Sequence, residues 1–245
     1  PFFTDQIVIG ITSDGTNLYC GGFSNSPIMK STDAGTTWTQ TNTSPIATEI
    51  NDIYVDPNNE NRMFASLMGT YNLNGDYDRE AIYFTNDGGM SWTRKGPDAH
   101  GLCLTVNPLD NSTFYLGSFA QGVYKTTNNF DSWTQLSANG VTVVDVIVSE
   151  ADTSVLLISE LDFGIPETEI KRSDDGGNSF TSVSSVIANR LMFNPNDNDT
   201  VYAATNDGVE ISDDFGLTFN PWVLSGEDCL TLQADGSDLY VGTAD

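Results

Sequence analysis

Short apolar segments separated by polar turns recur along the whole chain in a four-part cycle. A cycle opens on an apolar segment, crosses a polar turn and returns on a second apolar segment, as in residues 53–64 and 191–202. A third segment then runs into a Ser/Thr-rich turn, and a fourth begins at an aromatic residue. Short apolar runs bounded by Gly, Asn, Asp and Pro are typical of β-strands, and no segment has a sustained helical period. The pattern predicts an all-β chain.

An eight-residue motif marks the turn between the third and fourth strands. It reads Ser/Thr-x-Asp/Asn-x-Gly-x-Ser/Thr-Trp/Phe and occurs five times. Its third position holds Asp33, Asp87, Asn128, Asp175 and Asp214, and its last position holds Trp38, Trp92, Trp133, Phe180 and Phe219. We expect the polar side chains to bond the backbone of a tight hairpin and the ring to pack between neighbouring cycles. The third copy has Phe130 in the Gly position and should form the least regular hairpin.

These motifs resemble the Asp-box (BNR) repeats of sialidases, sortilin-type receptors, xyloglucanase-like glycoside hydrolases and photosystem assembly factors. The resemblance and the repeat length imply a β-propeller of four-stranded blades, with five complete blades and a partial sixth. A single propeller domain over residues 1–245 would have blades at about 6–40, 51–95, 102–136, 144–183, 190–222 and, in part, 229–245. An incomplete last blade would mean that the chain is a fragment of a longer one, or that a partner chain completes the blade.

The charge of the chain excludes several classes of partner. It has 9 Lys and Arg against 34 Asp and Glu, which gives a net charge of −25. Nucleic acids and anionic membrane faces attract clustered positive charge, which is missing here. No run of 18 apolar residues is present, so we expect no membrane insertion. The remaining ligands are glycans, polar protein surfaces and divalent cations, and the acidic surface suits an extracellular location, on a cell surface or a virion surface.

Two long connections between second and third strands are candidate binding loops, at residues 69–80 and 159–169. The first has oxygen-bearing side chains at alternate positions, which could converge on Ca²⁺. These residues are Asn72, Asn74, Asp76, Asp78 and Glu80. Aromatic rings beside carboxylates suit sugar binding, and the loops offer Tyr71, Tyr77 and Phe163. The alternatives are a solvated loop or a hairpin extension of the strands, with the rings packed on the blade.

A further candidate site lies on the first strand of each cycle, just before its apolar pair. The six residues there are Val8, Asp52, Cys103, Asp145, Arg190 and Cys229, which we expect to ring the central channel. Asp52 and Asp145 could form the acid–base pair of a glycoside hydrolase, and Arg190 could bind a polar ligand. The alternative is a hub held by Asp–Arg pairing. His100, the only histidine, is a candidate binding residue in a loop on the same face.

The defining residues of the enzyme families are missing. The N-terminal Arg-Ile-Pro-type motif of sialidases is absent, as is the early Asp-Val-Gly-Gly-Ala-Tyr-type motif that carries the catalytic Asp of xyloglucanase-like enzymes. The sequence therefore favours a secreted or surface-displayed binding module for a glycan or protein ligand, or a subunit of an extracellular assembly, appendage or virion. The alternative is a glycoside hydrolase that uses a carboxylate pair on the loop face. Ca²⁺ is the one cofactor that the residues suggest.

Overall fold

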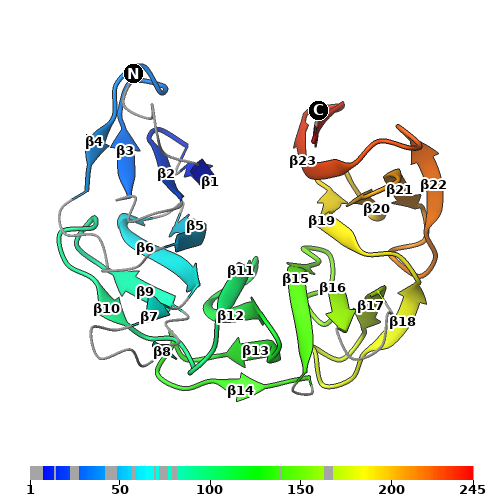
Figure 1. Cartoon of the computed structure of the whole chain (residues 1–245), viewed down its shortest axis with the longest axis horizontal. Coiled ribbons are helices and arrows are strands. Elements are labelled where there is room, and N and C mark those ends of the chain that lie inside the picture. Colours follow the sequence, from blue (N-terminus) through cyan, green and yellow to red (C-terminus); the bar gives the residue numbers. More distant parts are fainter. Residues whose placement is uncertain are drawn as a thin grey trace. The chain divides into compact units, whose positions relative to one another are not determined.

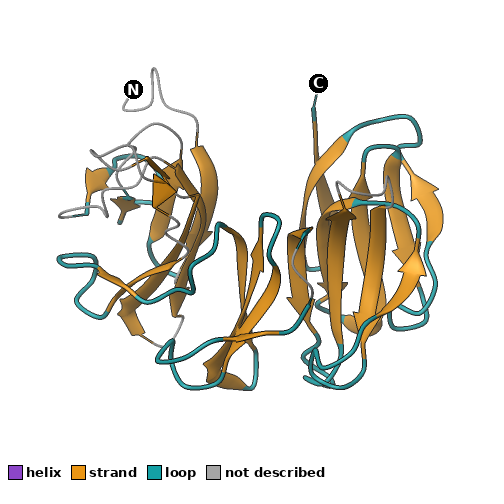
Figure 2. Ribbon diagram, turned by 60° about the horizontal axis from the view of Figure 1, so that its bottom comes forward, coloured by secondary structure: helices purple, strands orange, loops and turns teal. Residues whose placement is uncertain are grey.

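The described part of the chain is built from strands and turns. The computed structural model describes residues 8–13, 15–22, 28–41, 49–56, 59–68, 70–71, 77–78, 82–137, 140–162 and 168–244. Figure 2 shows strands and loops but no helix among these residues. None of them belongs to a helix with the length and apolar character needed to cross a membrane. The all-β prediction is therefore confirmed for the part of the chain that the structure describes.

Five sheets have four antiparallel strands each and a sixth has two (Figure 1), while β7 (Thr70–Tyr71) and β8 (Tyr77–Asp78) form a separate two-stranded ribbon. The first contains β1 (Val8–Ser13), β2 (Leu18–Gly22), β3 (Met29–Ser31) and β4 (Thr39–Gln40). The second contains β5 (Glu49–Asp56), β6 (Asn59–Met68), β9 (Ile82–Thr85) and β10 (Thr93–Arg94), and the third contains β11 (Gly101–Asn107), β12 (Asp110–Ser118), β13 (Gly122–Thr126) and β14 (Thr134–Gln135).

The later sheets repeat this plan. The fourth contains β15 (Val141–Val148), β16 (Leu156–Asp162), β17 (Thr168–Ser173) and β18 (Thr181–Ser184). The fifth contains β19 (Ala188–Asn194), β20 (Asp197–Thr205), β21 (Gly208–Ser212) and β22 (Asn220–Val223), and the last contains β23 (Cys229–Asp235) and β24 (Asp238–Thr243). Each strand pairs with the next within its sheet. These are the five complete blades and the partial sixth of a β-propeller, as predicted.

The chain divides into two compact units. Unit 1 comprises Pro1–Leu104 and Phe130–Trp133, and unit 2 comprises Thr105–Asn129 and Thr134–Asp245. Within unit 1, β5 contacts β1 and β2, and within unit 2, β15 contacts β12, β19 contacts β15, and β23 contacts β19. The first strand of each later sheet therefore packs against the preceding sheet of its unit. The prediction that residues 1–245 form a single domain stays a prediction.

The motif turns adopt one backbone conformation, with positive φ at the fourth and fifth residues of every copy. In the second copy, Asp87 accepts hydrogen bonds from the Ser91 hydroxyl at 2.5 Å, the Thr85 hydroxyl at 2.6 Å and the Ser91 N–H at 2.9 Å. These three donors lower the pKa of Asp87 to about 2. Asp33, Asp175 and Asp214 accept the same set of bonds. An ionised carboxylate thus closes each of these four hairpins.

The third hairpin follows the same backbone pattern, with φ of 54° at Asn129 and 70° at Phe130. The Thr126 hydroxyl donates to Asn128 at 3.0 Å. The ring of Phe130 is buried, 4.6 Å from the ring of Phe64 and 5.5 Å from that of Trp133. Aromatic packing offsets the strain of a bulky residue at positive φ. The prediction of an irregular third hairpin is therefore wrong for its backbone angles.

The aromatic rings of the motif pack in two ways. Trp92 packs against the buried cluster shared by the first and second sheets, and Phe219 against the cluster shared by the fourth and fifth. The Nε1 of Trp38 donates to a carbonyl of its own turn at 3.1 Å, and that of Trp133 donates to the carbonyl just after β10 at 2.9 Å. Phe180 lies beside the fifth residue of its own turn. The aromatic residues of the motif therefore contact both their own hairpins and the junctions between sheets.

Candidate functional site

A β-bulge shapes the first strand of five of the six sheets. The register shifts lie between Val8 and Gly10, Ile50 and Asp52, Val143 and Asp145, Ala188 and Arg190, and Cys229 and Thr231. The residue that follows the bulge is thus Gly10, Asp52, Asp145, Arg190 or Thr231. Val8 and Cys229 lie two residues before this position, and a slip of two residues leaves the alternation of apolar positions unchanged, so the alternation alone could not place them. Cys229 is fully buried.

Asp145 joins two neighbouring sheets of unit 2. Its Oδ1 accepts from the N–H of Val146 at 3.0 Å, and its Oδ2 accepts from the N–H of Leu191, on β19, at 2.7 Å. The guanidinium of Arg190 lies 3.5 Å from Oδ1. The Asp145 side chain is 3% exposed, whereas that of Arg190 is 48% exposed. Burial raises the pKa of Asp145, and Arg190 and the two N–H groups oppose this rise.

Asp52 has the same arrangement within unit 1. It accepts from the N–H of Ile53 at 2.9 Å and from the N–H of Leu104, on β11, at 3.3 Å. Cys103, the next predicted channel residue, is buried immediately before Leu104. The bulge residue Asn51 adds a second link, because its amide donates to the carbonyl of Gly101 at 2.7 Å. Asp52 therefore ties the first strand of one sheet to the first strand of the next.

The two predicted catalytic aspartates lie in different units, and each one binds main-chain N–H groups of its own unit. The structure brings Asp145 and Arg190 together, as the hub interpretation expects. A second bulge residue, Asn189, donates to the carbonyl of Cys229 at 2.9 Å and repeats the link made by Asn51. The local geometry thus gives both aspartates a positioning role between strands.

A cavity of about 280 Å³ opens beside Arg190 in unit 2. Its polar lining residues are Thr105, Glu150, Arg190, Asn194 and Gln233. Its apolar lining residues are Ile147, Val148, Leu191, Met192, Phe193, Pro195 and Leu232. A half-exposed guanidinium beside apolar walls can pair with a carboxylate while an apolar group packs next to it. The volume lies just below the usual range for whole small molecules, so the cavity fits one end group of a larger ligand.

Most predicted loop residues fall outside the described part of the chain. Asn72, Asn74, Asp76, Glu80 and Phe163 are not among the described residues. Tyr71, Tyr77 and Asp78 are described by their backbone alone: β7 (Thr70–Tyr71) pairs with β8 (Tyr77–Asp78) as a small antiparallel ribbon. The connection therefore includes the hairpin extension that was one of the alternatives.

The metal and histidine predictions concern two different loops. The residues that the structure describes include no group of three or more His, Cys, Asp or Glu side chains placed to hold a metal ion. The Ca²⁺ site in loop 69–80 stays a prediction, because most of its ligands lie outside those residues. His100 is half-buried directly before β11, which places it beside the Gly101 carbonyl that binds Asn51.

A charged cluster at the second long connection was missed by sequence reasoning. Glu160 and Glu169 are cross-strand partners on β16 and β17. The Nζ of Lys171 lies 2.6 Å from Glu160 and 3.4 Å from Glu169. Burial opposes ionisation of Lys171, but the two carboxylates outweigh it and raise its pKa. The two glutamates are visible at the ends of the insertion, yet their cross-strand pairing depends on how far the strands extend into it.

The sheets and turn motifs together define an Asp-box β-propeller. A sequence model of the Sortilin-Vps10 family, described as sortilin, neurotensin receptor 3, matches residues 26–161, which is more than half of the chain. The chain therefore belongs to this family. A search of curated proteins by sequence found no match.

Several solved structures share the fold. The GH74 enzyme of Niastella koreensis is 23% identical with a TM-score of 0.70, over 88% of this chain and 37% of that one. The GH74 xyloglucanase of Xanthomonas campestris is 18% identical with a TM-score of 0.71, over 97% and 42%. The extracellular domain of a hybrid two-component system from B. thetaiotaomicron is 12% identical with a TM-score of 0.70, over 96% and 32%. The chain thus spans less than half the length of these structures, and identities this low show the fold alone.

Proposed function

We propose that this chain is a ligand-binding propeller of an extracellular or surface-displayed protein, and that the cavity at Arg190 receives an acidic end group of a peptide or glycan. The half-exposed guanidinium of Arg190 within an apolar-walled cavity carries the proposal. The family description, which names a receptor, and the extracellular domain among the similar structures support it. Asp145 pairs with the guanidinium at 3.5 Å and thereby orients it.

Hydrolysis is the weaker alternative. The carboxylates of Asp52 and Asp145 each accept hydrogen bonds from two main-chain N–H groups. A general acid or nucleophile must reach the substrate. A carboxylate oxygen that already accepts a hydrogen bond from a neighbouring strand is poorly placed to do so. The GH74 structures support the alternative at the level of the fold. It predicts release of reducing sugar from xyloglucan, with loss of turnover but not of folding in Asp52→Asn or Asp145→Asn.

Binding of short acidic ligands tests the proposal. Peptides with free C-terminal carboxylates are compared with their amidated forms, and uronic-acid oligosaccharides with neutral ones. We expect the carboxylate forms to bind and Arg190→Gln to weaken binding at least about tenfold, since a charge-assisted pair contributes about 1.5–3 kcal/mol. Arg94→Gln is the matched control, because Arg94 is an exposed arginine of unit 1. Equal binding by wild type and Arg190→Gln would refute the assigned site.

A further inference from the structure

The Arg190 cavity lies on the first strands of the third to sixth sheets. It is lined by Thr105 from β11, Ile147 from β15, Met192 from β19 and Gln233 from β23. β15 contacts β19, and β19 contacts β23. The walls beside Arg190 are thus formed by strands on both sides of β19.

Arg190 is the accessible cation of unit 2. This unit has four basic side chains, all of them described, and Arg190 alone is exposed. Lys171 lies 2.6 Å from the carboxylate of Glu160 and is 25% exposed. The guanidinium of Arg190 also has a carboxylate beside it, that of Asp145, yet its side chain stays 48% exposed. A dissolved anion can therefore reach Arg190 while Asp145 remains paired with it.

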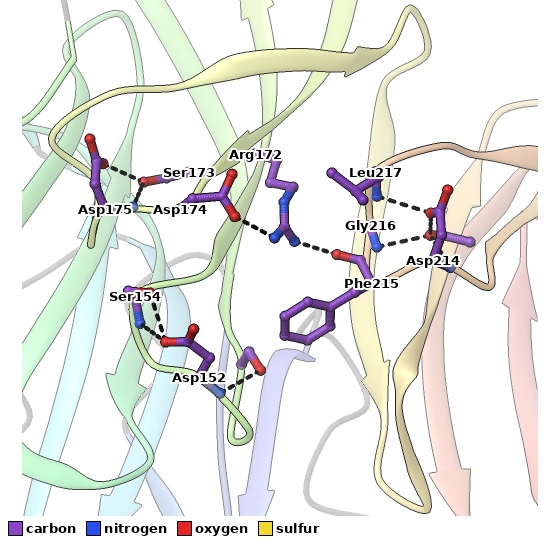
Figure 3. A network of polar contacts seen from close by, with 12 residues as sticks. Asp152, Ser154, Arg172, Ser173, Asp174, Asp175, Asp214, Phe215, Gly216 and Leu217 are labelled. Carbon is purple, nitrogen blue, oxygen red and sulfur yellow. Dashed lines mark hydrogen bonds and ion pairs between the residues drawn. The ribbon is translucent and has the colours of Figure 1, made fainter.

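The other two cations of unit 2, Lys125 and Arg172, join neighbouring sheets. Lys125, on β13, donates from Nζ to the carbonyl of Gly176 at 2.9 Å. Arg172, on β17, donates to the carbonyl of Phe215 and pairs with Asp174 (Figure 3). Gly176 and Phe215 are the fourth residues of their Asp boxes, and each donates its own N–H to a carbonyl in or next to the second strand of its own sheet. These two cations hold the fold together and are not offered to a ligand.

The Asp145 carboxylate has a position open for a proton. Its Oδ1 accepts from the N–H of Val146 and lies 3.5 Å from the guanidinium of Arg190. Its Oδ2 accepts from the N–H of Leu191 at 2.7 Å. Each oxygen of a carboxylate has two lone pairs. A proton on the second lone pair of Oδ2 therefore removes the negative charge of Asp145 while both N–H bonds and the position of Arg190 are kept.

Among the described residues of the strands in contact with β15, Arg190 on β19 is the charged group that lies at Asp145. On β16, the uncharged Ser159 lies opposite Asp145. The other titratable side chains described on these strands have partners of their own, and they are Asp110, Tyr115, Tyr124, Lys125 and Glu160. Glu150, the second charged residue of the cavity lining, is the alternative source of a pH effect.

Burial favours the protonated form of Asp145. Its side chain is 3% exposed, and burial raises the pKa of the carboxyl against the influence of Arg190 and the two N–H groups. An anion that pairs with Arg190 brings a second negative charge to the same guanidinium, which raises the pKa of Asp145 further. Because coupling between two binding events is reciprocal, protonation of Asp145 must strengthen the binding of the anion by the same factor.

We propose that Asp145 and Arg190 form a proton-coupled anion site, in which an anion binds Arg190 more tightly once a proton from solvent has neutralised Asp145 at Oδ2. The cavity then takes up its ligand in mildly acidic solution and releases it as the pH rises. This inference rests on the proposed function, because it concerns the regulation of the same cavity. Anions on two sides of one guanidinium lie about 6–7 Å apart, where their repulsion corresponds to at least about tenfold in affinity between the two protonation states.

Binding of p-toluenesulfonate from about pH 8 to about pH 5 measures the coupling, because a sulfonate stays ionised throughout and its ring suits the apolar walls. Salt at about 0.15 M screens carboxylates beyond about 8 Å, whereas Asp145 lies 3.5 Å from Arg190. We expect the affinity to rise at least about threefold over this range, with uptake of up to one proton per anion, measured by calorimetry in buffers of different ionisation enthalpy. Asp145→Asn should bind with the same affinity at both ends of the range and take up no proton.

Matched variants identify the group that takes up the proton. Glu150→Gln removes the other carboxylate of the cavity and should keep the pH dependence, whereas Arg190→Gln should lose sulfonate binding at every pH. Circular dichroism checks the folding of Asp145→Asn, and proton uptake by the wild type and by Glu150→Gln decides the question without that variant. Neutral p-toluenesulfonamide should show no pH dependence.

The outcomes separate this inference from the proposed function. Arg190-dependent binding with equal affinity across the pH range, binding without proton uptake, an unchanged pH dependence in Asp145→Asn, or its loss in Glu150→Gln would overturn the proton coupling and leave the proposed function standing. Absence of any binding that depends on Arg190, for the sulfonate and for carboxylate ligands alike, would overturn both.

Discussion

Replacing Asp145 with Asn tests whether this carboxylate holds two sheets of unit 2 together. Asn keeps one carbonyl oxygen, so either the Val146 or the Leu191 N–H loses its acceptor and meets an NH₂ donor. An unsatisfied buried N–H costs about 1–3 kcal/mol. The lost pairing with Arg190 adds less than about 1 kcal/mol, because half of that side chain is in solvent. A neutral amide regains some of the cost of burying a charge, so we expect a net loss of about 2 kcal/mol.

Arg190→Gln is the natural comparison, because it removes the ion pair and leaves both N–H groups bonded. Its unfolding free energy should fall by less than about 1 kcal/mol. Urea unfolding measures both variants, and hydrogen exchange with mass spectrometry follows the amides of β15 and β19 separately from those of unit 1. Protection at Leu191 should fall in Asp145→Asn and persist in Arg190→Gln. If both variants unfold within about 0.5 kcal/mol of wild type and Leu191 stays protected, the inter-strand role is refuted.

Two further outcomes follow from the turns. The pKa of Asp87 is lowered from 3.8 to about 2, chiefly by the Ser91 hydroxyl, so the stability it contributes is present above pH 3.8 and is lost as the pH falls toward 2. Asp87→Asn should flatten this acid-side dependence in urea unfolding at a series of pH values, and an unchanged slope would contradict the assignment. Gly208 and Gly140 have φ of 102° and 101°, but a Cβ at Gly208 would lie 2.6 Å from the Val223 oxygen, whereas nothing lies within 4 Å at Gly140. Gly208→Ala should therefore lower the unfolding free energy by at least about 2 kcal/mol more than Gly140→Ala does. Equal losses would show that backbone strain alone matters.

The number of blades could be predicted from the sequence because the turn motif is local. Its polar residues bond the backbone within five positions, so residue types and spacing are enough to recognise each hairpin. The third copy is the exception, because its turn also depends on a contact with a residue far away in the sequence. Phe130 was expected to disturb its turn, but the Phe64 ring of the preceding sheet stabilises the left-handed conformation. A contact with a residue so distant along the chain leaves no trace in the motif itself.

The candidate site was harder to predict because a slip of two residues leaves the alternation of apolar positions along a first strand unchanged. Counting alternate residues placed Cys229 with Asp145 and Arg190, whereas the pairing of β23 with β24 puts Thr231 there. The sequence pattern identified Arg190 and Asp145 as neighbours of interest. It could not reveal that the Asp145 carboxylate binds the Leu191 N–H, since that bond depends on how two sheets pack.

In the fourth and fifth Asp-box turns, the fourth residue bonds two sheets at once, and this has a consequence for the evolution of the chain. Its N–H serves its own sheet and its carbonyl serves the sheet before, as at Gly176 and Phe215. A stretch of DNA that encodes one repeat therefore encodes a turn that bonds the preceding sheet. It also encodes the strands that bond the turn of the following sheet. Duplication of such a stretch adds a blade whose new joints are already matched, and deletion removes one without leaving an unmatched pair. Families built in this way can change their number of blades in single genetic events, while the loops between strands diverge independently.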